Sequence, residues 1–187
     1  MSTLNTLGVA HRFIKEHIKE GDFCIDATAG RGNDTLFLSK LVGESGKVIA
    51  FDIQDDAIKS TKTLLAENDI SCAEVIKDSH SNMDAYAKEE TVDCITFNFG
   101  YLPGGDHNIC TRAESSIIAI EKGLYLLKPC GIMSLCIYYG GDSGFDEKNA
   151  LMEYLRTIDN KKYTVIVTDF YNRPNCPPIA VSIIKDC

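Results

Sequence analysis

The chain has 187 residues, of which 44% are hydrophobic and 25% are charged, and these values exclude a disordered chain, a collagen and a coiled coil. The length corresponds to one globular domain, and a net charge of −8 argues against a protein that coats nucleic acid through bulk charge. No apolar run approaches the roughly 20 residues that cross a bilayer, and we see no signal peptide, so we expect a cytoplasmic protein without a membrane partner.

Short apolar runs alternate with amphipathic stretches along the chain, which begins with a predicted helix at 4–19. Further helices are predicted at 33–41, 55–67, 111–127 and 147–155, the 111–127 helix being stopped by the Pro and Gly that follow it. Strands are predicted at 23–26, 48–52, 73–76, 92–97, 132–138, 163–170 and 179–184.

This alternation of strands and helices favours an α/β fold with a mostly parallel sheet and helices on both faces. The nearly continuous apolar runs are typical of strands that are buried on both sides. Only a loop separates the last two strands, so we expect the last of the seven strands to be antiparallel. The sequence therefore predicts a single domain over residues 1–187, with an N-terminal helix within 1–20.

A glycine-containing loop follows the first predicted strand and opens a helix, over residues 26–35. Small residues let the backbone approach a ligand closely, and a helix N-terminus offers free N–H groups. Asp52 ends the next strand about 20 residues further on, where an acidic side chain suits a ribose diol. A tight turn that merely requires glycine is the alternative, but the acidic residues favour a nucleotide site.

The loop is neither GxxxxGK[ST] nor G-x-G-x-x-G, because Thr35 stands where the third glycine would be. The carboxylates of Asp26 and Asp34, on either side of the glycines, suit the ammonium and sulfonium groups of S-adenosylmethionine better than a pyrophosphate. Asp-x-x-x-Gly-x-Gly with an Asp ending the second strand resembles class I methyltransferases, which have a Rossmann-like fold. The cofactor-binding candidates of these loops are Asp26, Ala29, Gly30, Gly32, Asn33, Asp34, Asp52 and Gln54.

Two further loops are expected at the same edge of the sheet. In class I methyltransferases a polar residue after the third strand commonly faces the adenine amine, which makes Asp78, Ser79 and His80 cofactor candidates. His80 could equally be a loop histidine or a helix cap. After the fourth strand these enzymes hold the acceptor atom, which points to Asn98 and Tyr101, although a turn-rich connection is the alternative.

The chain resembles the bacterial family known as putative rRNA methylases. The resemblance rests on residues 26–36, 50–54, 78–80 and 98–106, the last of which contains Gly-Tyr-Leu-Pro-Gly-Gly-Asp. It implies an S-adenosylmethionine-dependent enzyme that methylates the aminomethyl group of 5-aminomethyl-(2-thio)uridine at the tRNA wobble position. Two departures affect the substrate side: Tyr138-Tyr139 replaces a Tyr-His pair, and Cys176 replaces an Asn before Pro-Pro.

The resemblance also suggests catalytic residues. Asn98 and Asp106 would orient the amine, with Asp106 the better proton acceptor, while Tyr101 and Tyr138 could stack on the uridine. A local basic stripe or a homodimer would let so acidic a protein bind tRNA. The candidates for RNA contact, which flank the expected site loops, are Arg112 and Arg173.

Other functions stay open: an rRNA or small-molecule methyltransferase, an NAD-dependent oxidoreductase with a degenerate loop, and a non-catalytic adenosine-ligand binder. The net negative charge suits a small-molecule substrate better than RNA. The eight cysteines form no CxxC pair, so we expect reduced thiols, no metal site and an incidental Cys187.

Overall fold

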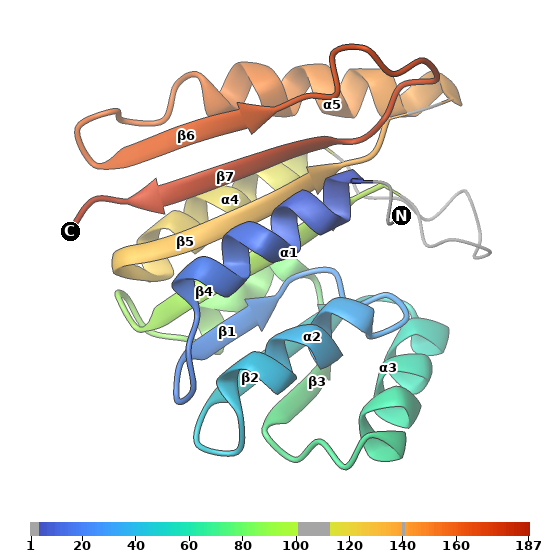
Figure 1. The fold of residues 1–187 in the computed structure, drawn as a ribbon, viewed down its shortest axis with the longest axis vertical. Helices are drawn as coiled ribbons and strands as arrows, with labels where there is room; N and C mark the ends of the chain where they lie inside the picture. Colours follow the sequence, from blue (N-terminus) through green and yellow to red (C-terminus); the bar gives the residue numbers. More distant parts are fainter. Residues whose placement is uncertain (1–3, 101–112, 140) are drawn as a thin grey trace.

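One seven-stranded sheet organises the protein, whose computed structural model describes residues 4–100, 113–139 and 141–187 and, for 141–144, the backbone alone. The strand order is β3-β2-β1-β4-β5-β7-β6 (Figure 1). Strand β7 is antiparallel to both of its neighbours and the other pairs are parallel, which confirms the predicted sheet. The strands are β1 (Phe23–Asp26), β2 (Lys47–Asp52), β3 (Ala73–Lys77), β4 (Val92–Phe99), β5 (Leu127–Ile137), β6 (Tyr163–Thr168) and β7 (Ile179–Lys185).

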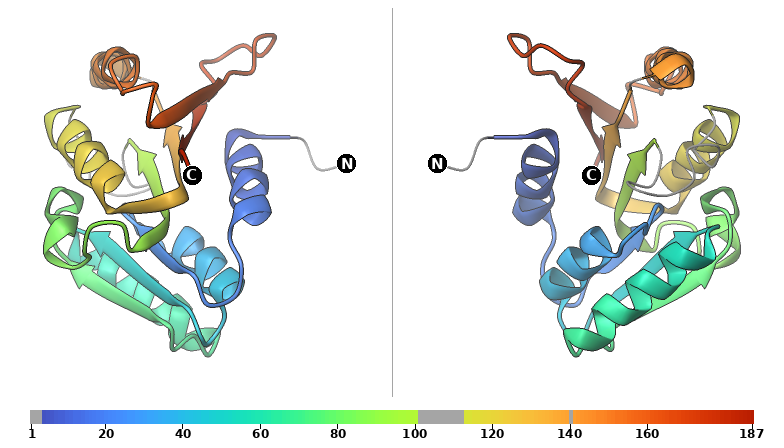
Figure 2. Two further views of the ribbon diagram at one scale, coloured as in Figure 1. Left: turned by 90° about the vertical axis from the view of Figure 1, so that its left-hand side faces the viewer. Right: turned by 90° about the vertical axis from the view of Figure 1, so that its right-hand side faces the viewer.

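Helices cover both faces of this sheet, as predicted. Figure 2 shows α1 and α2 on one face of the sheet and α4 and α5 on the other. On the first face α2 also contacts α3, and on the second face α4 packs on η1. None of the helices that the structure describes is long and apolar enough to span a bilayer. The helices are α1 (Thr6–His17), α2 (Asn33–Val42), α3 (Asp55–Glu67), the 3-10 helix η1 (His80–Ala85), α4 (Ala113–Leu126) and α5 (Gly141–Leu155).

The main departure from the predicted elements lies between α4 and β5. Strand β5 begins at Leu127, which pairs with Val92, and the register shifts between Val92 and Cys94. Pro129 and Gly131 therefore lie in the irregular start of a strand, whereas the sequence pattern assigned them to the end of a helix. Strand β5 begins this early because it pairs with β4, and the apolar periodicity of a single segment does not reveal such a pairing.

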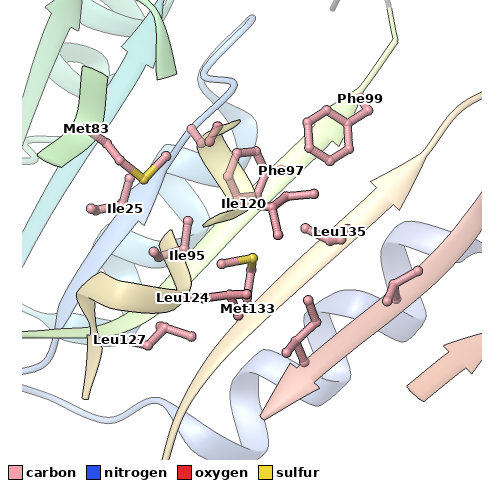
Figure 3. Packing of buried hydrophobic residues seen from close by; sticks show 14 of the residues in the cluster. Ile25, Met83, Ile95, Phe97, Phe99, Ile120, Leu124, Leu127, Met133 and Leu135 are labelled. Carbon is pink, nitrogen blue, oxygen red and sulfur yellow. The ribbon is translucent and has the colours of Figure 1, made fainter. Parts of the chain in front are cut away.

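The larger hydrophobic core lies between the sheet and the helices α4, η1 and α5. Figure 3 shows Phe97 and Ile95 of β4 beside Ile120 of α4 and Met133 of β5, all at most 1% exposed. A second cluster on the opposite face includes Ile14 of α1. Because both faces are covered, the inner strands are apolar on both sides, which explains their continuous hydrophobic runs.

The parallel strands β1 to β5 end at one edge of the sheet, hereafter the carboxyl edge. Since β7 is antiparallel to β6, the loop between them, residues 169–178, also lies at this edge (Figure 1). Helix α1 begins there too, because the Thr6 hydroxyl donates a 2.6 Å hydrogen bond to the Pro178 carbonyl. The loops that carry the predicted site residues therefore converge.

A disulfide joins Cys130 of β5 to Cys187, the last residue. The prediction of reduced thiols and of an incidental C-terminal cysteine is wrong for this pair. Antiparallel pairing of β5 with β7 aligns Ile132 with Ile184, which brings the C-terminus beside the start of β5. The other cysteines that the structure describes are free: Cys24, Cys72, Cys94, Cys136 and Cys176.

The packing of α1 predicts a measurable loss of stability. Ile14 is 2% exposed in the second cluster, so Ile14→Ala should lower the free energy of unfolding by about 2–5 kcal/mol through lost burial and a cavity. Urea unfolding monitored by circular dichroism measures this. The exposed Glu16, two residues along the same helix, provides the control, because Glu16→Ala should change the value by less than about 0.5 kcal/mol. Equal effects of the two variants would contradict the packing of α1.

Candidate functional site

The glycine loop between β1 and α2 is held in one conformation by its own backbone. Gly32 is the N-cap residue of α2 with φ of +86°, and the Gly32 amide donates to the Ala29 carbonyl at 2.8 Å. A Cβ atom at position 32 would lie 2.8 Å from the Cα atom of Thr61 in α3. Both the positive φ and this close approach require glycine, so the start of α2 lies tightly against α3.

Asp52, at the end of β2, fastens this loop from the side. One carboxylate oxygen accepts a hydrogen bond from the Gly30 amide and the other from the Gln54 amide, both at 2.9 Å. Each oxygen has a second lone pair, which a ribose hydroxyl could use. Asp52 thus combines the structural role of shaping a turn with the geometry of a ribose acceptor.

Asp26 lies beneath the loop and is fully buried. Its carboxyl accepts hydrogen bonds from the Thr35 hydroxyl at 2.6 Å and from the Thr28 amide at 3.2 Å. Burial, and then the negative charge of Asp34, raise the pKa of Asp26 to about 7. The carboxyl therefore anchors the loop, and a cation bound nearby would favour its charged form.

Asp34, in the first turn of α2, joins two distant parts of the chain. One of its oxygens lies 2.7 Å from Nε2 of His11 in α1, and the other accepts a 2.6 Å hydrogen bond from the Asn98 side-chain amide of β4. The Asn98 backbone amide donates to the Thr28 hydroxyl at 2.7 Å. The cofactor candidate Asp34 and the catalytic candidate Asn98 are thus in direct contact.

His11 is the residue of this cluster that the sequence analysis missed. Its ring is stacked on the Phe37 ring of α2, with centroids 3.8 Å apart and an interplanar angle of 7°. A signal existed, because His11 is three residues before the buried Ile14 and follows the buried Ala10, which places it beside the packed face of α1. Thr28 and Thr35, which bond to Asn98 and Asp26, were also not singled out.

The loop after β3 uses its polar groups differently. The Asp78 carboxylate accepts hydrogen bonds from the Asn82 side chain at 2.8 Å and the Tyr86 hydroxyl at 2.9 Å, and these bonds lower its pKa. Ser79 caps η1 by accepting from the Ser81 amide. These two candidates lie at the carboxyl edge, where they also hold η1 in place.

His80 packs inward, edge-on to Phe97 and Phe99 of β4, and burial lowers its pKa. Within the part of the chain that the structure describes, its buried Nε2 atom has no hydrogen-bond partner. His80 is therefore a neutral side chain beneath the edge of the sheet.

The remaining candidates have simple placements. Ala29 is 5% exposed within the loop, Asn33 is the first residue of α2, and Gln54 is the N-cap residue of α3. Tyr101 and Asp106 lie outside the described residues, as does Arg112. The structure thus brings together the end of β1, the glycine loop, the end of β2 and Asn98.

The buried Asp26 predicts a pH dependence of stability. Its pKa is about 7 in the folded protein against an ordinary value of 3.8, so the folded state binds this proton more tightly. The resulting stabilisation is complete below about pH 4 and is lost as the pH rises to about 7. Asp26→Asn should therefore flatten the pH dependence of the unfolding free energy across this window, as measured by urea unfolding at a series of pH values.

Asp186→Asn is the control for this prediction, because Asp186 is exposed. Its unfolding free energy should follow that of the wild type across the same window. A parallel dependence in wild type and Asp26→Asn would contradict the raised pKa.

Comparisons with known proteins agree with this geometry. The model of a family described as putative rRNA methylase matches residues 48–184. A protein of Arabidopsis thaliana named tRNA (mnm(5)s(2)U34)-methyltransferase, chloroplastic, is 35% identical over 179 residues, which are 90% of this chain and 65% of that protein. The chain thus spans just under two thirds of the length of this relative.

Two solved structures are similar over almost their whole length. A putative rRNA-methylase from Clostridium thermocellum has 49% identity and a TM-score of 0.96, covering 99% of this chain and 100% of the other. A putative methyltransferase from Streptococcus mutans, in complex with SAH, has 33% identity and a TM-score of 0.89, covering 98% and 99%. The chain therefore belongs to the putative rRNA methylase family, and its fold is that of S-adenosylmethionine-dependent methyltransferases.

Proposed function

We propose that this chain transfers a methyl group from S-adenosylmethionine to the aminomethyl nitrogen of 5-aminomethyl-(2-thio)uridine at the tRNA wobble position. The product is the 5-methylaminomethyl nucleoside. The observation that carries the proposal is the 35% identity, over 90% of this chain, to a protein named as a tRNA (mnm(5)s(2)U34)-methyltransferase. The geometry of the carboxyl edge supports each half of the reaction.

The cofactor side fits S-adenosylmethionine. Asp52 presents carboxylate oxygens beside the glycine loop for the ribose, and Gln54 stands next to it at the start of α3. Asp26 and Asp34 supply negative charge near the ammonium and sulfonium groups. The narrow glycine turn lets the backbone lie against the methionine part, since no Cβ occupies position 30 or 32.

Bound S-adenosylmethionine supplies an electrophilic methyl group, so the protein has to orient the amine and accept its proton. Asn98, at the end of the central strand β4, orients the amine. Asp106 accepts the proton in this proposal, and Tyr101 stacks on the uridine. Tyr138, which directly follows β5, lies beside the end of β4, since its amide donates to the Phe99 carbonyl at 3.0 Å.

The proposal predicts the outcome of one assay. Wild-type protein, labelled S-adenosylmethionine and tRNA from cells that lack this enzyme should give label only in the wobble nucleoside. Mass analysis should show 5-aminomethyl-(2-thio)uridine gaining one methyl group. Label in another nucleoside would sink the wobble assignment, whereas no label, with SAH binding intact, would indicate a small-molecule acceptor.

The loop between β6 and β7 carries side chains that favour an RNA substrate. The Arg173 guanidinium lies 4.0 Å from the centroid of the Phe170 ring. The side chain of Tyr171, the residue after Phe170, is fully exposed. A cation and an exposed aromatic ring at the carboxyl edge suit the phosphates and unstacked bases of an anticodon loop. A local contact of this kind is compatible with a net charge of −8.

This contact predicts that Arg173→Gln and Tyr171→Ala each weaken tRNA binding, the tyrosine variant by about tenfold. Fluorescence anisotropy with an anticodon stem-loop RNA measures the affinity. Lys47→Gln is the matched control, because Lys47 also lies over a ring, 5.2 Å from the Phe23 centroid, but at the opposite edge of the sheet. Unchanged affinity in both loop variants would remove this loop from the RNA interface.

A further inference from the structure

We propose that His11 is a positioning residue of the methyl-transfer site, acting through Asp34 to orient the Asn98 side chain. The inference rests on the proposed function, in which Asn98 orients the substrate amine. It assigns a role in the reaction to the N-terminal helix, which precedes all seven strands.

The first step of the argument is the orientation of the Asn98 amide. A carboxylate only accepts hydrogen bonds, so the atom of Asn98 that lies 2.6 Å from Asp34 is the amide nitrogen. The carbonyl oxygen is then the atom with which Asn98 accepts a hydrogen bond. An amine that is about to attack a methyl group needs such an acceptor for one of its N–H groups while its lone pair points at the methyl carbon.

The second step is the orientation of the Asp34 carboxylate. Without a partner on its other oxygen, this carboxylate could rotate and offer the Asn98 amide a poorer geometry. His11 provides that partner at 2.7 Å. The contact is partly shielded from water, since the two side chains are 26% and 11% exposed, so it is stronger than the same hydrogen bond would be on the open surface.

The third step is the rigidity of His11 itself. Stacking on Phe37 fixes the plane of the imidazole, and Phe37 lies three residues after Asp34 on the same helix. Helix α1 is held by the buried Ile14 and by the bond from Thr6 to the loop before β7. His11 therefore approaches Asp34 from a fixed support, and its stacked ring has less freedom to rotate than the ring of an exposed histidine.

The backbone of Asn98 is held independently of this chain of contacts. Its amide donates to the Thr28 hydroxyl, and β4 pairs on both sides, with β1 and with β5. Loss of the His11 contact should therefore leave strand β4 in place and change only the freedom of the Asn98 side chain. This separation makes a positioning role distinguishable from a structural one.

His11→Phe is the informative variant. It keeps a ring on Phe37 and removes Nε2, whereas His11→Gln retains an N–H donor at a similar reach. We expect His11→Phe to lower kcat for tRNA methylation by about tenfold to a hundredfold, the effect of losing a hydrogen bond to a charged group. The KM for tRNA and the affinity for SAH should stay within about twofold, and His11→Gln should recover most of the rate.

His17→Phe is the matched control, since His17 lies on the same helix and its described side-chain contacts are with the carbonyl and the ring of Phe13. It should leave kcat unchanged. A readout independent of turnover is the pair of side-chain amide protons of Asn98 in ¹H–¹⁵N spectra, identified by their absence in Asn98→Ala. They should be resolved in the wild type and broadened or shifted in His11→Phe.

The outcomes separate the two proposals. A wild-type chain that methylates no tRNA would overturn the proposed function and this role with it. An active wild type whose Asn98 signals and kcat are the same in His11→Phe would overturn the role of His11 alone. A fall in kcat in both His11→Phe and His11→Gln, with the same loss of thermal stability in the two variants, would assign His11 a structural role instead.

Discussion

Parallel pairing of β1 between β2 and β4 is the constraint from which the site follows. In this register Asp26 is aligned with Ala50 on one side and with Thr96 on the other, so the three strands end on the same side of the sheet, with β2 and β4 continuing to Asp52 and Phe99. Each following loop leaves the sheet beside the others. That is why Asp52 reaches the Gly30 amide and Asn98 reaches Asp34, although long stretches of chain separate the members of each pair.

The same constraint crowds carboxylates into a shielded space. A buried charge is tolerated only where hydrogen bonds replace its hydration. Asp26 accepts a hydrogen bond from the Thr35 hydroxyl, and Asp52 accepts hydrogen bonds from backbone N–H groups. Asp34 is hydrogen-bonded to the side chains of His11 and Asn98. These donors do not compensate fully, because burial and Asp34 still raise the pKa of Asp26 to about 7. The site therefore suits the ammonium and sulfonium groups of S-adenosylmethionine better than the negatively charged pyrophosphate of a dinucleotide.

The carboxyl edge is divided by β4. On the side of β1, β2 and β3 lie the glycine loop and Asp52, which suit a nucleoside. On the side of β5, β7 and β6 lie Tyr138 and the loop that carries Tyr171 and Arg173, which suit an RNA acceptor. Helix α1 connects the two sides, since it bonds to the loop before β7 through Thr6 and to Asp34 through His11, five residues later. The N-terminal helix is therefore part of the site as well as of the core.

The sequence by itself determined the order and type of the strands and α-helices and the identity of the glycine loop, because apolar periodicity and the turn preference of glycine are local properties. The predicted strand was shorter than β5, because Leu127 belongs to the strand only through its pairing with Val92. The tertiary structure alone decided which side chains meet. His11 joins Asp34 across 23 residues, and Cys130 joins Cys187 across 57. Such contacts depend on how strands pair and helices pack, and no spacing within one segment encodes them.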